Sequence, residues 1–489
     1  MELIAAQYRG RARVLQAKLF VLSFLNTDYT RRSEMEKKEI YRRAFTLALP
    51  MMLQNAITNA VALVDNMMVG NLGTESITAV SIIGQFLFVF QLGVFGAISG
   101  PGIYGAQFFG KNNMEGVKNS FRMKLWLSFG FLLLSGIILF EGAEPLIEIY
   151  MKGGSDTINQ SLVIAEGTLY LKWIMISFLP FIVSQAYAST MREIGDSMMP
   201  MIAGFGAVLV DVIGNYVLIY GKCGFPVLGV QGAAIATIVA RVIEALMVIL
   251  FAHLGKRHKD VFNGIYDKIF IPRKLAMQMI QRGIPIFFNE FLWAGAMVSL
   301  AQCYSSRGLE VVASLNMCVT LCNLFAVVYT NLGMAVGILI GQLLGKGSFQ
   351  EARKHAFILA DFSAKLCIVL LVIVVGLAFI FPSCYQVSDK IKEYAKWLII
   401  ITAFSFPVEG ILNAFYFAIR AGGRTGITFL FDSVFSWGIC YVAAFALCRY
   451  TSLSIFMIFA IIKGLDMGKA MIGYILLGSD IWLQNLAEQ

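Results

Sequence analysis

The sequence predicts an all-α polytopic membrane protein with twelve transmembrane helices, arranged as two six-helix bundles related by a pseudo-two-fold axis along the membrane normal. Composition is the first observation that predicts this fold, and the spacing of the apolar runs and an internal duplication are the others. Of the 489 residues, 58% are hydrophobic and only 14% are charged, against roughly 25% in soluble domains. The mean hydropathy of +0.73 fits a chain that lies mostly in lipid.

The apolar runs are long enough to cross a bilayer, since a membrane helix needs about 20 apolar residues. Gly, Pro and charged residues separate the runs and mark the loops. The pattern predicts helices near residues 45–70, 77–107, 125–149, 162–190, 198–220, 230–254, 284–304, 313–343, 358–382, 393–419, 426–447 and 453–478. We expect a cytoplasmic N-terminal extension, a first bundle, a cytoplasmic linker and a second bundle at residues 1–40, 41–254, 255–283 and 284–489.

The distribution of Lys and Arg predicts the orientation. If the N-terminus is cytoplasmic, the inner loops carry Lys111, Lys118, Arg122, Lys124, Arg192, Lys256, Arg257, Lys259, Lys268, Arg273, Lys274, Arg282, Lys346, Arg353, Lys354, Arg420 and Arg424. The outer loops carry only Lys152, Lys222, Arg307, Lys390, Lys392 and Arg449. The positive-inside rule therefore predicts a multi-pass protein of the cell membrane with both termini in the cytoplasm. The net charge of +9 then reflects topology, and we expect the lipid bilayer as partner and no nucleic acid.

Residues 1–34 differ from the rest of the chain. Their apolar run at residues 19–25 has seven residues and is followed by Asn26, Thr27 and Asp28, so it is too short to span. Met35 begins a stretch typical of the cytoplasmic start of a first helix. We interpret residues 1–34 as an upstream extension of the reading frame or a dispensable tail, with a basic surface helix as the alternative.

The two halves of the chain repeat one another. At an offset of 235 (285 − 50) identical residues pair without a gap: Pro50 with Pro285, Gly73 with Gly308, Glu75 with Glu310, Phe90 with Phe325, Gly102 with Gly337, Gln107 with Gln342, Gly110 with Gly345 and Lys111 with Lys346. Further along, an offset of 228 (420 − 192) pairs Arg192 with Arg420 and Gly195 with Gly423. Six helices per half place both halves in the same orientation, so the pseudo-two-fold axis runs along the membrane normal. Duplication within one chain favours a carrier, expected as a monomer, over a channel built from symmetric subunits.

Four segments carry a resemblance to a known family. They are LALPMMLQNAITNAVALVDNMMVGNLG at 47–73, LGVQGAAIATIVA at 228–240, MREIGD at 191–196 with its echo IRAGGRT at 419–425, and DIWLQNL at 480–486. Over about residues 40–489 the chain resembles the multidrug and toxic compound extrusion (MATE) transporters. The resemblance implies a twelve-helix antiporter that exports organic cations or drugs in exchange for Na⁺ or H⁺ by alternating access. It also implies a superfamily that includes flippases for lipid-linked saccharides.

Polar residues at membrane depth are candidate functional residues, because an ionisable side chain there is costly and faces the protein interior. On the first helix, Gln54 and Thr58 lie eleven and seven residues before Asp65, within about 20° of its direction around the helix. We expect Asp65 and Thr58 to take part in ion coupling, with a structural carboxylate at Asp65 as the alternative. The position resembles the acidic residue that the family carries on this helix.

The fifth and sixth helices add further candidates for ion coupling. Asp211 and Asn215 are four residues apart and share one face, and Thr237 lies on the next helix. Oxygen ligands suit hard cations, so Asp65 and Asp211 are a possible Na⁺ site as well as a proton site. Arg241 and Glu244 are expected to neutralise each other.

The second half offers candidates for substrate binding. Glu290 and Asn289 lie on the seventh helix and Asn413 on the tenth, and we add Gln54 of the first helix to this set. Glu290 matches the neutral Asn55 in the first half, so the halves are chemically unequal. Lys463, Asp466 and Lys469 on the last helix are spaced to pair with one another.

Other function classes have little support. The segment GAQFFGKN at 105–112 has P-loop spacing, but Asn112 stands where Ser or Thr must bind magnesium, and a membrane helix precedes it. We expect no cofactor beyond the coupling ion and no enzymatic activity. The eight cysteines lie mostly inside apolar stretches and form no disulfide framework, and we expect Cys318 and Cys322 to be buried free thiols. A flippase for a lipid-linked saccharide or another amphiphile stays the alternative function.

Overall fold

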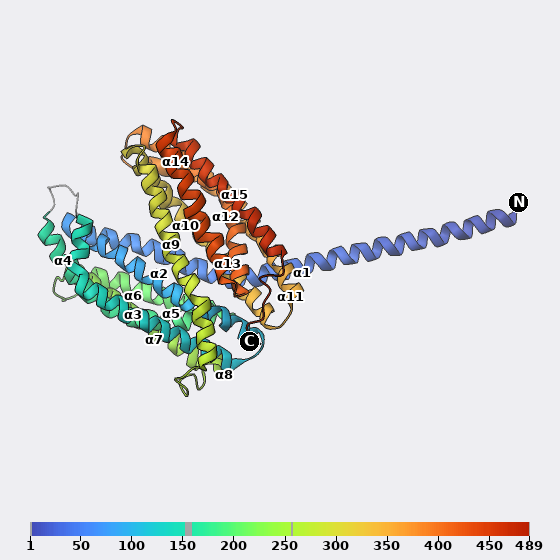
Figure 1. The fold of residues 1–489 in the computed structure, drawn as a ribbon, viewed down its shortest axis with the longest axis horizontal. Coiled ribbons are helices and arrows are strands. Elements are labelled where there is room, and N and C mark those ends of the chain that lie inside the picture. The colour runs from blue at the N-terminus through green and yellow to red at the C-terminus, as the bar shows by residue number, and fades with distance from the viewer. Residues whose placement is uncertain (1, 152–158, 256–257, 489) are drawn as a thin grey trace.

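The computed structural model describes residues 2–151, 159–255 and 258–488, and for residues 2–33 and Leu63 it describes the backbone alone. The described chain consists of helices and connecting loops (Figure 1). The first half contains α1 (Glu2–Gly70), α2 (Thr74–Gly110), α3 (Met114–Met151), α4 (Gln160–Ile174), α5 (Phe178–Glu193), α6 (Met198–Tyr220) and α7 (Val230–Leu254). The second half contains α9 (Arg273–Ser305), α10 (Leu309–Gly345), α11 (Phe349–Ala378), α12 (Asp389–Ala421), α13 (Thr425–Phe429), α14 (Val442–Tyr450) and α15 (Ile455–Gly478).

The number of spans agrees with the predicted architecture. In the described part of the chain, eleven helices are long and apolar enough to cross a membrane, with α4 and α5 counted as one span and α13 and α14 as another. The twelfth predicted span is α15. Its 24 residues reach about 36 Å at 1.5 Å per residue, but it carries Lys463, Asp466 and Lys469 in its middle.

The two halves form two bundles that diverge like the arms of a V (Figure 1). Towards the open end of the V each bundle has its own apolar core. One core draws only on residues between Met68 and Ala234, and the other only on residues between Leu300 and Leu465. At this end the bundles therefore pack independently.

At the other end the bundles interlock through two cores shared between the halves. Residues between Ile40 and Met52 of α1 pack against α10, α11 and α12 of the second bundle. In the same way, Met279 and Ile286 of α9 pack against the first bundle. These contacts are related by the duplication, since Met279 matches Ala44 and Ile286 matches Met51 at the offset of 235. We call this the basic end, because the loops with most Lys and Arg lie there.

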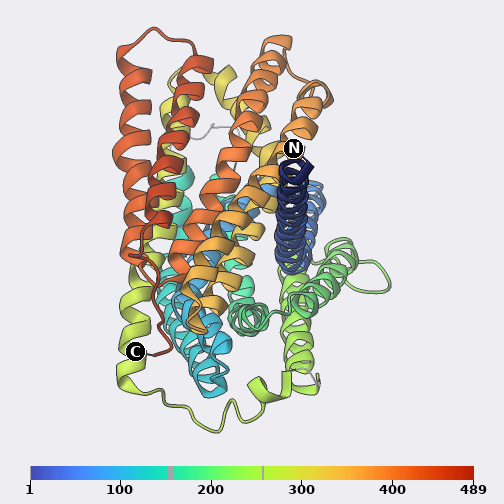
Figure 2. The ribbon, with the colours of Figure 1, turned by 90° about the vertical axis from the view of Figure 1, so that its right-hand side faces the viewer.

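Several helices begin earlier than predicted, including α3 at Met114 and α11 at Phe349 in place of 125 and 358. Helix α9 begins at Arg273, eleven residues before the predicted start at 284 (284 − 273), because Leu275, Ala276 and Met279 recur at helical spacing and pack into a shared core. The connection from α7 to α9 is correspondingly shorter and includes the short helix α8 (Lys259–Phe262). Helix α1 begins at Glu2, so the backbone of residues 2–33 continues the first span away from the bundles (Figure 1), and Figure 2 views this helix nearly end-on. The interpretation of residues 1–34 as a tail stays a prediction.

Candidate functional site

A pair of carboxylates lies inside the first bundle. Asp65 of α1 and Asp211 of α6 are close enough to interact directly. The Asn215 amide, one turn along α6 from Asp211, donates a hydrogen bond of 2.8 Å to Oδ1 of Asp65. Close packing of α6 on α7 supports this geometry, because a Cβ on Gly214 would lie 2.9 Å from Cβ of Ala236.

Helix α7 completes the surroundings of this pair. Thr237 and Arg241 both interact with Asp211. The Arg241 guanidinium also has partners outside this pair, because its Nη1 donates to Oε2 of Glu244 at 2.8 Å and it lies over the Phe181 ring. The expected pairing of Arg241 with Glu244 is therefore confirmed.

Two oxygens of this site are buried and accept no hydrogen bond within the described residues, namely Oδ1 of Asp211 and Oδ1 of Asn215. Two neighbouring carboxylates in a poorly solvated site resist full ionisation unless a proton or a cation neutralises one of them. The oxygens of Asp65, Asp211, Asn215 and Thr237 are suitable donors for a hard cation. The described residues hold no group of three or more His, Cys, Asp or Glu that could bind a metal ion, so a cation here relies on amide and hydroxyl oxygens as well.

Two residues of the predicted polar stripe lie elsewhere. The Thr58 hydroxyl is exposed and donates to the backbone oxygen of Gln54 at 2.9 Å. Gln54 lies nearer the basic end, where its Oε1 accepts a hydrogen bond of 3.0 Å from Arg192. The structure thus brings Asp65, Asp211, Asn215 and Thr237 together without Thr58 or Gln54, because eleven residues of helix separate Gln54 from Asp65 by about 16 Å along the axis.

The second bundle holds a more extensive charge network. The Asn289 amide donates to Oδ2 of Asp432 at 3.0 Å and to the Tyr416 hydroxyl at 3.2 Å. Lys469 donates to the other Asp432 oxygen at 2.7 Å, and Ser433 donates to Oδ1 of Asn289 at 2.7 Å. Every polar atom of the Asn289 amide is therefore engaged within the bundle.

Asp432 lies where its span leaves α-helical geometry. Residues Leu430–Val434 and Ser436–Tyr441 between α13 and α14 are π-helical. Such wide turns are uncommon and cluster at functional sites. Here the π-helical stretch includes both Asp432 and Ser433, two of the residues that bind Asn289.

The lysines of α15 form their ion pairs with other elements, so the expected pairing among the charged residues of α15 holds only in part. Lys469 binds Asp432, and Lys463 lies 3.2 Å from Oε1 of Glu409 on α12. Asp466 interacts electrostatically with both lysines. The three side chains face the bundle interior, where carboxylates from α12 and the π-helical stretch are nearer partners than the residues one turn along α15.

We expect Lys469→Met to destabilise the second bundle. It leaves the Asp432 carboxylate inside the bundle without its cation, and breaking a buried ion pair costs on the order of 3 kcal/mol. The melting temperature of the purified protein should fall by several degrees. The double variant Lys469→Met with Asp432→Asn should recover most of this loss, and an equal fall in both variants would contradict the argument.

The other substrate-binding candidates of the second half lie apart from one another. Glu290 is largely buried, and its Oε1 lies 3.8 Å from Nη1 of Arg420. The Asn413 amide donates to the backbone oxygen of Glu409 one turn earlier, and its Cβ packs on Gly333. The structure therefore places Glu290 beside the interface of the bundles and Asn413 within the packing of α10 against α12.

A central cavity of about 130 Å³ lies between the two bundles near the basic end. Both halves line it, with Phe95, Ile98, Ile103, Arg192 and Glu193 from the first and Met334, Ile338, Phe417 and Arg420 from the second. Sequence reasoning placed Arg192 and Arg420 in inner loops and missed their position in this wall. The signal was present, because the two arginines match at the offset of 228.

A pair of glutamine side chains closes the basic end. Gln107 near the end of α2 donates to the backbone oxygen of Ala421 at the end of α12, at 2.7 Å. Gln342 near the end of α10 donates to the backbone oxygen of Glu193 at the end of α5, also at 2.7 Å. Gln107 matches Gln342 at the offset of 235 and Glu193 matches Ala421 at 228 (421 − 193), so these are two copies of one contact. We call this pair of bonds the glutamine clasp.

Two glycines allow the clasp to form. A Cβ on Gly110 would lie 2.0 Å from the backbone oxygen of Gln342, and a Cβ on Gly345 would lie 1.9 Å from that of Gln107. Gly110 ends the segment with P-loop spacing. The structure therefore gives that glycine a packing role where α2 crosses α10.

The C-terminal segment, residues 480–488, packs against the clasp. The backbone amide of Leu486 donates to Oε1 of Gln107 at 2.6 Å, and the side chains of Trp482 and Leu486 are buried. Arg353 of α11 forms an ion pair with Asp480. This segment contributes further contacts to both bundles where they meet.

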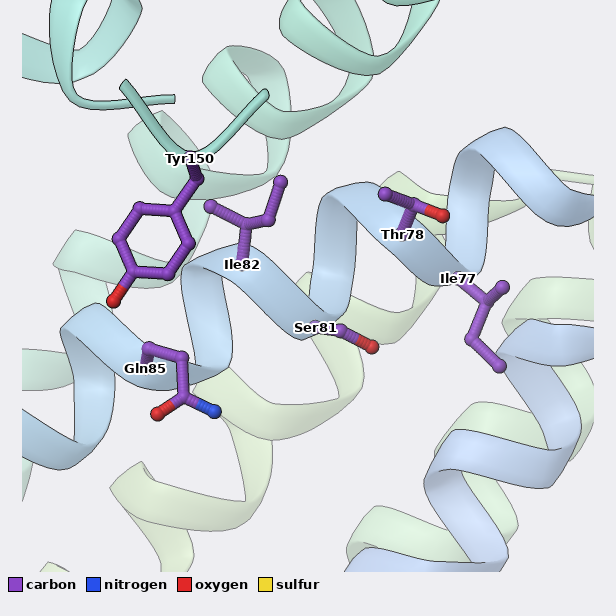
Figure 3. A pocket seen from close by; sticks show the side chains of 6 residues that line it. All are labelled: Ile77, Thr78, Ser81, Ile82, Gln85 and Tyr150. Carbon is purple, nitrogen blue, oxygen red and sulfur yellow. The ribbon is translucent and has the colours of Figure 1, made fainter. Parts of the chain in front are cut away.

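A second pocket lies at the opposite end of α2, towards the open end of the V. It is lined by Ile77, Thr78, Ser81, Ile82, Gln85 and Tyr150. Figure 3 shows Tyr150, from the end of α3, beside Ile82 and Gln85 of α2. None of these six lining residues is charged, so the pocket lacks the ionic chemistry of the other sites.

Comparisons with known proteins agree with this architecture. A model of the MatE family matches residues 50–217 and 285–446, one stretch in each half. The chain is 25% identical over 429 residues to the probable multidrug resistance protein YoeA of Bacillus subtilis (strain 168), covering 86% of this chain and 89% of that protein. It is 23% identical over 426 residues to the probable multidrug resistance protein NorM of Thermotoga maritima, covering 86% and 88%. A solved variant of the Vibrio cholerae MATE transporter VcmN has the same fold, with a TM-score of 0.81 at 16% identity, and the match covers 93% of this chain and 100% of that one.

Proposed function

The chain belongs to the MatE family of multidrug efflux transporters, and from this premise we propose that it exports organic cations in exchange for Na⁺ or H⁺. The carboxylate pair Asp65 and Asp211 is the observation that carries this proposal. Its unpaired oxygen and its amide and hydroxyl neighbours give one cation or proton a favourable site inside a membrane-spanning bundle. Glu290 is the corresponding candidate for contact with the cationic substrate in the second half.

The antiport follows from competition between charges. Binding of the coupling ion neutralises the pair and removes the attraction that the pair exerts on a cationic substrate. A substrate and an ion that exclude each other in this way exchange without ATP. The alternating-access step is the rocking of one bundle against the other, in which the interlocked basic end is the closed gate of this conformation and the separately packed halves at the open end are the parts that move.

We assign the basic end to the cytoplasm, so that the conformation described here is open to the outside of the cell. A reporter inserted after Lys268 should then be cytoplasmic, and a matched reporter inserted in the loop after Lys222 should be extracellular. Protease accessibility in intact cells measures both positions. Extracellular cleavage at the first position would contradict this orientation.

Transport in proteoliposomes tests the proposed function. A fluorescent organic cation should move against its gradient when a sodium gradient or a proton gradient is imposed, and only one of these two should support it. The matched control is the same vesicle preparation after an ionophore has collapsed the gradient. Ion conductance without exchange would indicate a channel, and movement of a lipid-linked saccharide without cation efflux would favour the flippase.

A further inference from the structure

Two arginines from different bundles face the same central cavity. Arg192 lies at the end of α5 and Arg420 at the end of α12, and both line the space between the bundles. They are copies of one position in the duplicated chain. A group that both arginines hold therefore touches both bundles where they meet.

Each guanidinium retains a buried donor without a hydrogen-bond partner among the described residues. Arg420 is only 6% exposed, and its Nη1 makes no hydrogen bond, because the nearest carboxylate oxygen, Oε1 of Glu290, is 3.8 Å away. Arg192 donates through Nη2 to Gln54, but its Nε is buried and unpaired. Unsatisfied donors on charged groups are costly, so a ligand that accepts from them gains free energy.

Two of the acidic residues nearby are held by other cations, whereas Glu290 lies beside Arg420 without a hydrogen bond to it. Glu193 is the one carboxylate among the described residues that line the cavity, and Lys124 contacts both of its oxygens, at 2.6 and 2.7 Å. Glu244, which interacts electrostatically with Arg192, is held by Arg241 at 2.8 Å. The cavity wall therefore presents positive charge that no hydrogen-bonded carboxylate balances.

The remaining wall is mainly apolar and aromatic. The Arg420 guanidinium lies over the rings of Phe95 and Phe417, with centroid distances of 5.6 and 5.3 Å. These rings restrict the guanidinium by cation–π contact. Ile98, Ile103 and Met334 add apolar surface. A mainly apolar cavity with a few convergent polar groups is the usual form of a small-molecule site.

We propose that Arg192 and Arg420 together bind the carboxylate of a zwitterionic amphiphile that this protein exports. The inference rests on the proposed function and deepens it, because the exported molecule then carries an acidic group besides its cationic part. Arginine is suited to this role, since its planar donors match the geometry of a carboxylate.

Two rhodamine dyes that differ only in one methyl ester test the proposal. The free acid is zwitterionic, whereas the ester is a simple cation with the same ring system. Binding of both dyes to the purified protein is measured by fluorescence anisotropy, and their efflux is measured in proteoliposomes. We expect Arg192→Gln with Arg420→Gln to weaken binding and efflux of the acid about tenfold and to leave the ester within about twofold, since only the acid loses charge-assisted hydrogen bonds to the two guanidinium groups.

Two further variants separate recognition from structure. Arg192→Lys with Arg420→Lys retains the charge and should retain part of the preference for the acid, whereas Lys172→Gln removes one positive charge from the exposed surface of α4 and should change neither dye. Equal losses for both dyes, or a wild-type protein that binds the acid no better than the double Gln variant does, would overturn the proposal. If the wild-type protein binds the dyes but transports neither, the proposed antiport fails, and the ratio of the two binding affinities still decides this inference.

Discussion

Asp65→Asn should reduce gradient-driven efflux on the order of a hundredfold, while the protein still folds and inserts. A loss of this size lies at the upper end of the free energies that usually couple two binding sites. Asn has nearly the same shape as Asp and can still accept the hydrogen bond from Asn215, so the packing of α1 against α6 is preserved. The charge that attracts the coupling ion is lost. Asp211→Asn should weaken efflux markedly, because one carboxylate of the pair then remains.

Asp361→Asn is the matched control for this experiment. It removes a carboxylate from a predicted membrane span as well, but Asp361 is 54% exposed and pairs with Lys365 on its own helix. Efflux of the same organic cation under one imposed gradient is compared for all variants. If Asp65→Asn drives efflux at the wild-type rate, the pair is structural and ion coupling must be sought in the second bundle, beginning with Glu290.

Gly345→Ala should reduce transport about tenfold or more by preventing closure of the basic end. The new Cβ would lie 1.9 Å from the backbone oxygen of Gln107, and backbone atoms cannot move aside as a flexible side chain does. The bundles must then separate where the glutamine clasp holds them. Gly110→Ala should have the same effect, because its Cβ would meet the backbone oxygen of Gln342 at 2.0 Å.

Gly376→Ala provides the matched control, since the same substitution in α11 meets nothing within 4 Å. Transport rates are compared with the distance between spin labels at positions 115 and 350, which lie on the two bundles at the basic end. We expect a longer distance in Gly345→Ala and no change in Gly376→Ala. A wild-type distance together with wild-type transport in Gly345→Ala would show that the clasp does not control this end.

The apolar periodicity was sufficient to predict the architecture of the chain, because in lipid each span must satisfy its own backbone hydrogen bonds and therefore forms a helix of bilayer length. The duplication predicted two bundles in one orientation for a similar reason, since the same sequence pattern folds in the same way twice. Element ends were harder to predict. The start of α9 at Arg273 depends on Met279 packing into the other bundle, which helix propensity does not encode.

The candidate residues also divide into pairs within one helix, which the sequence predicted, and contacts between helices, which it did not. Helical spacing correctly grouped Asp211 with Asn215 and Arg241 with Glu244, since each pair lies on one helix. Contacts between helices depended on the tertiary structure.

Only the tertiary structure joined Lys469 to Asp432, separated Thr58 from Asp65 and turned Arg192 and Arg420 into the wall of one cavity. The sequence by itself determined which charged side chains lie at membrane depth, because the apolar runs define the spans. A charge within a span faces the protein interior, since its exposure to lipid is costly. Their partners were decided by how the helices cross, which depends on close contacts such as that of Gly110 with Gln342 across the two bundles.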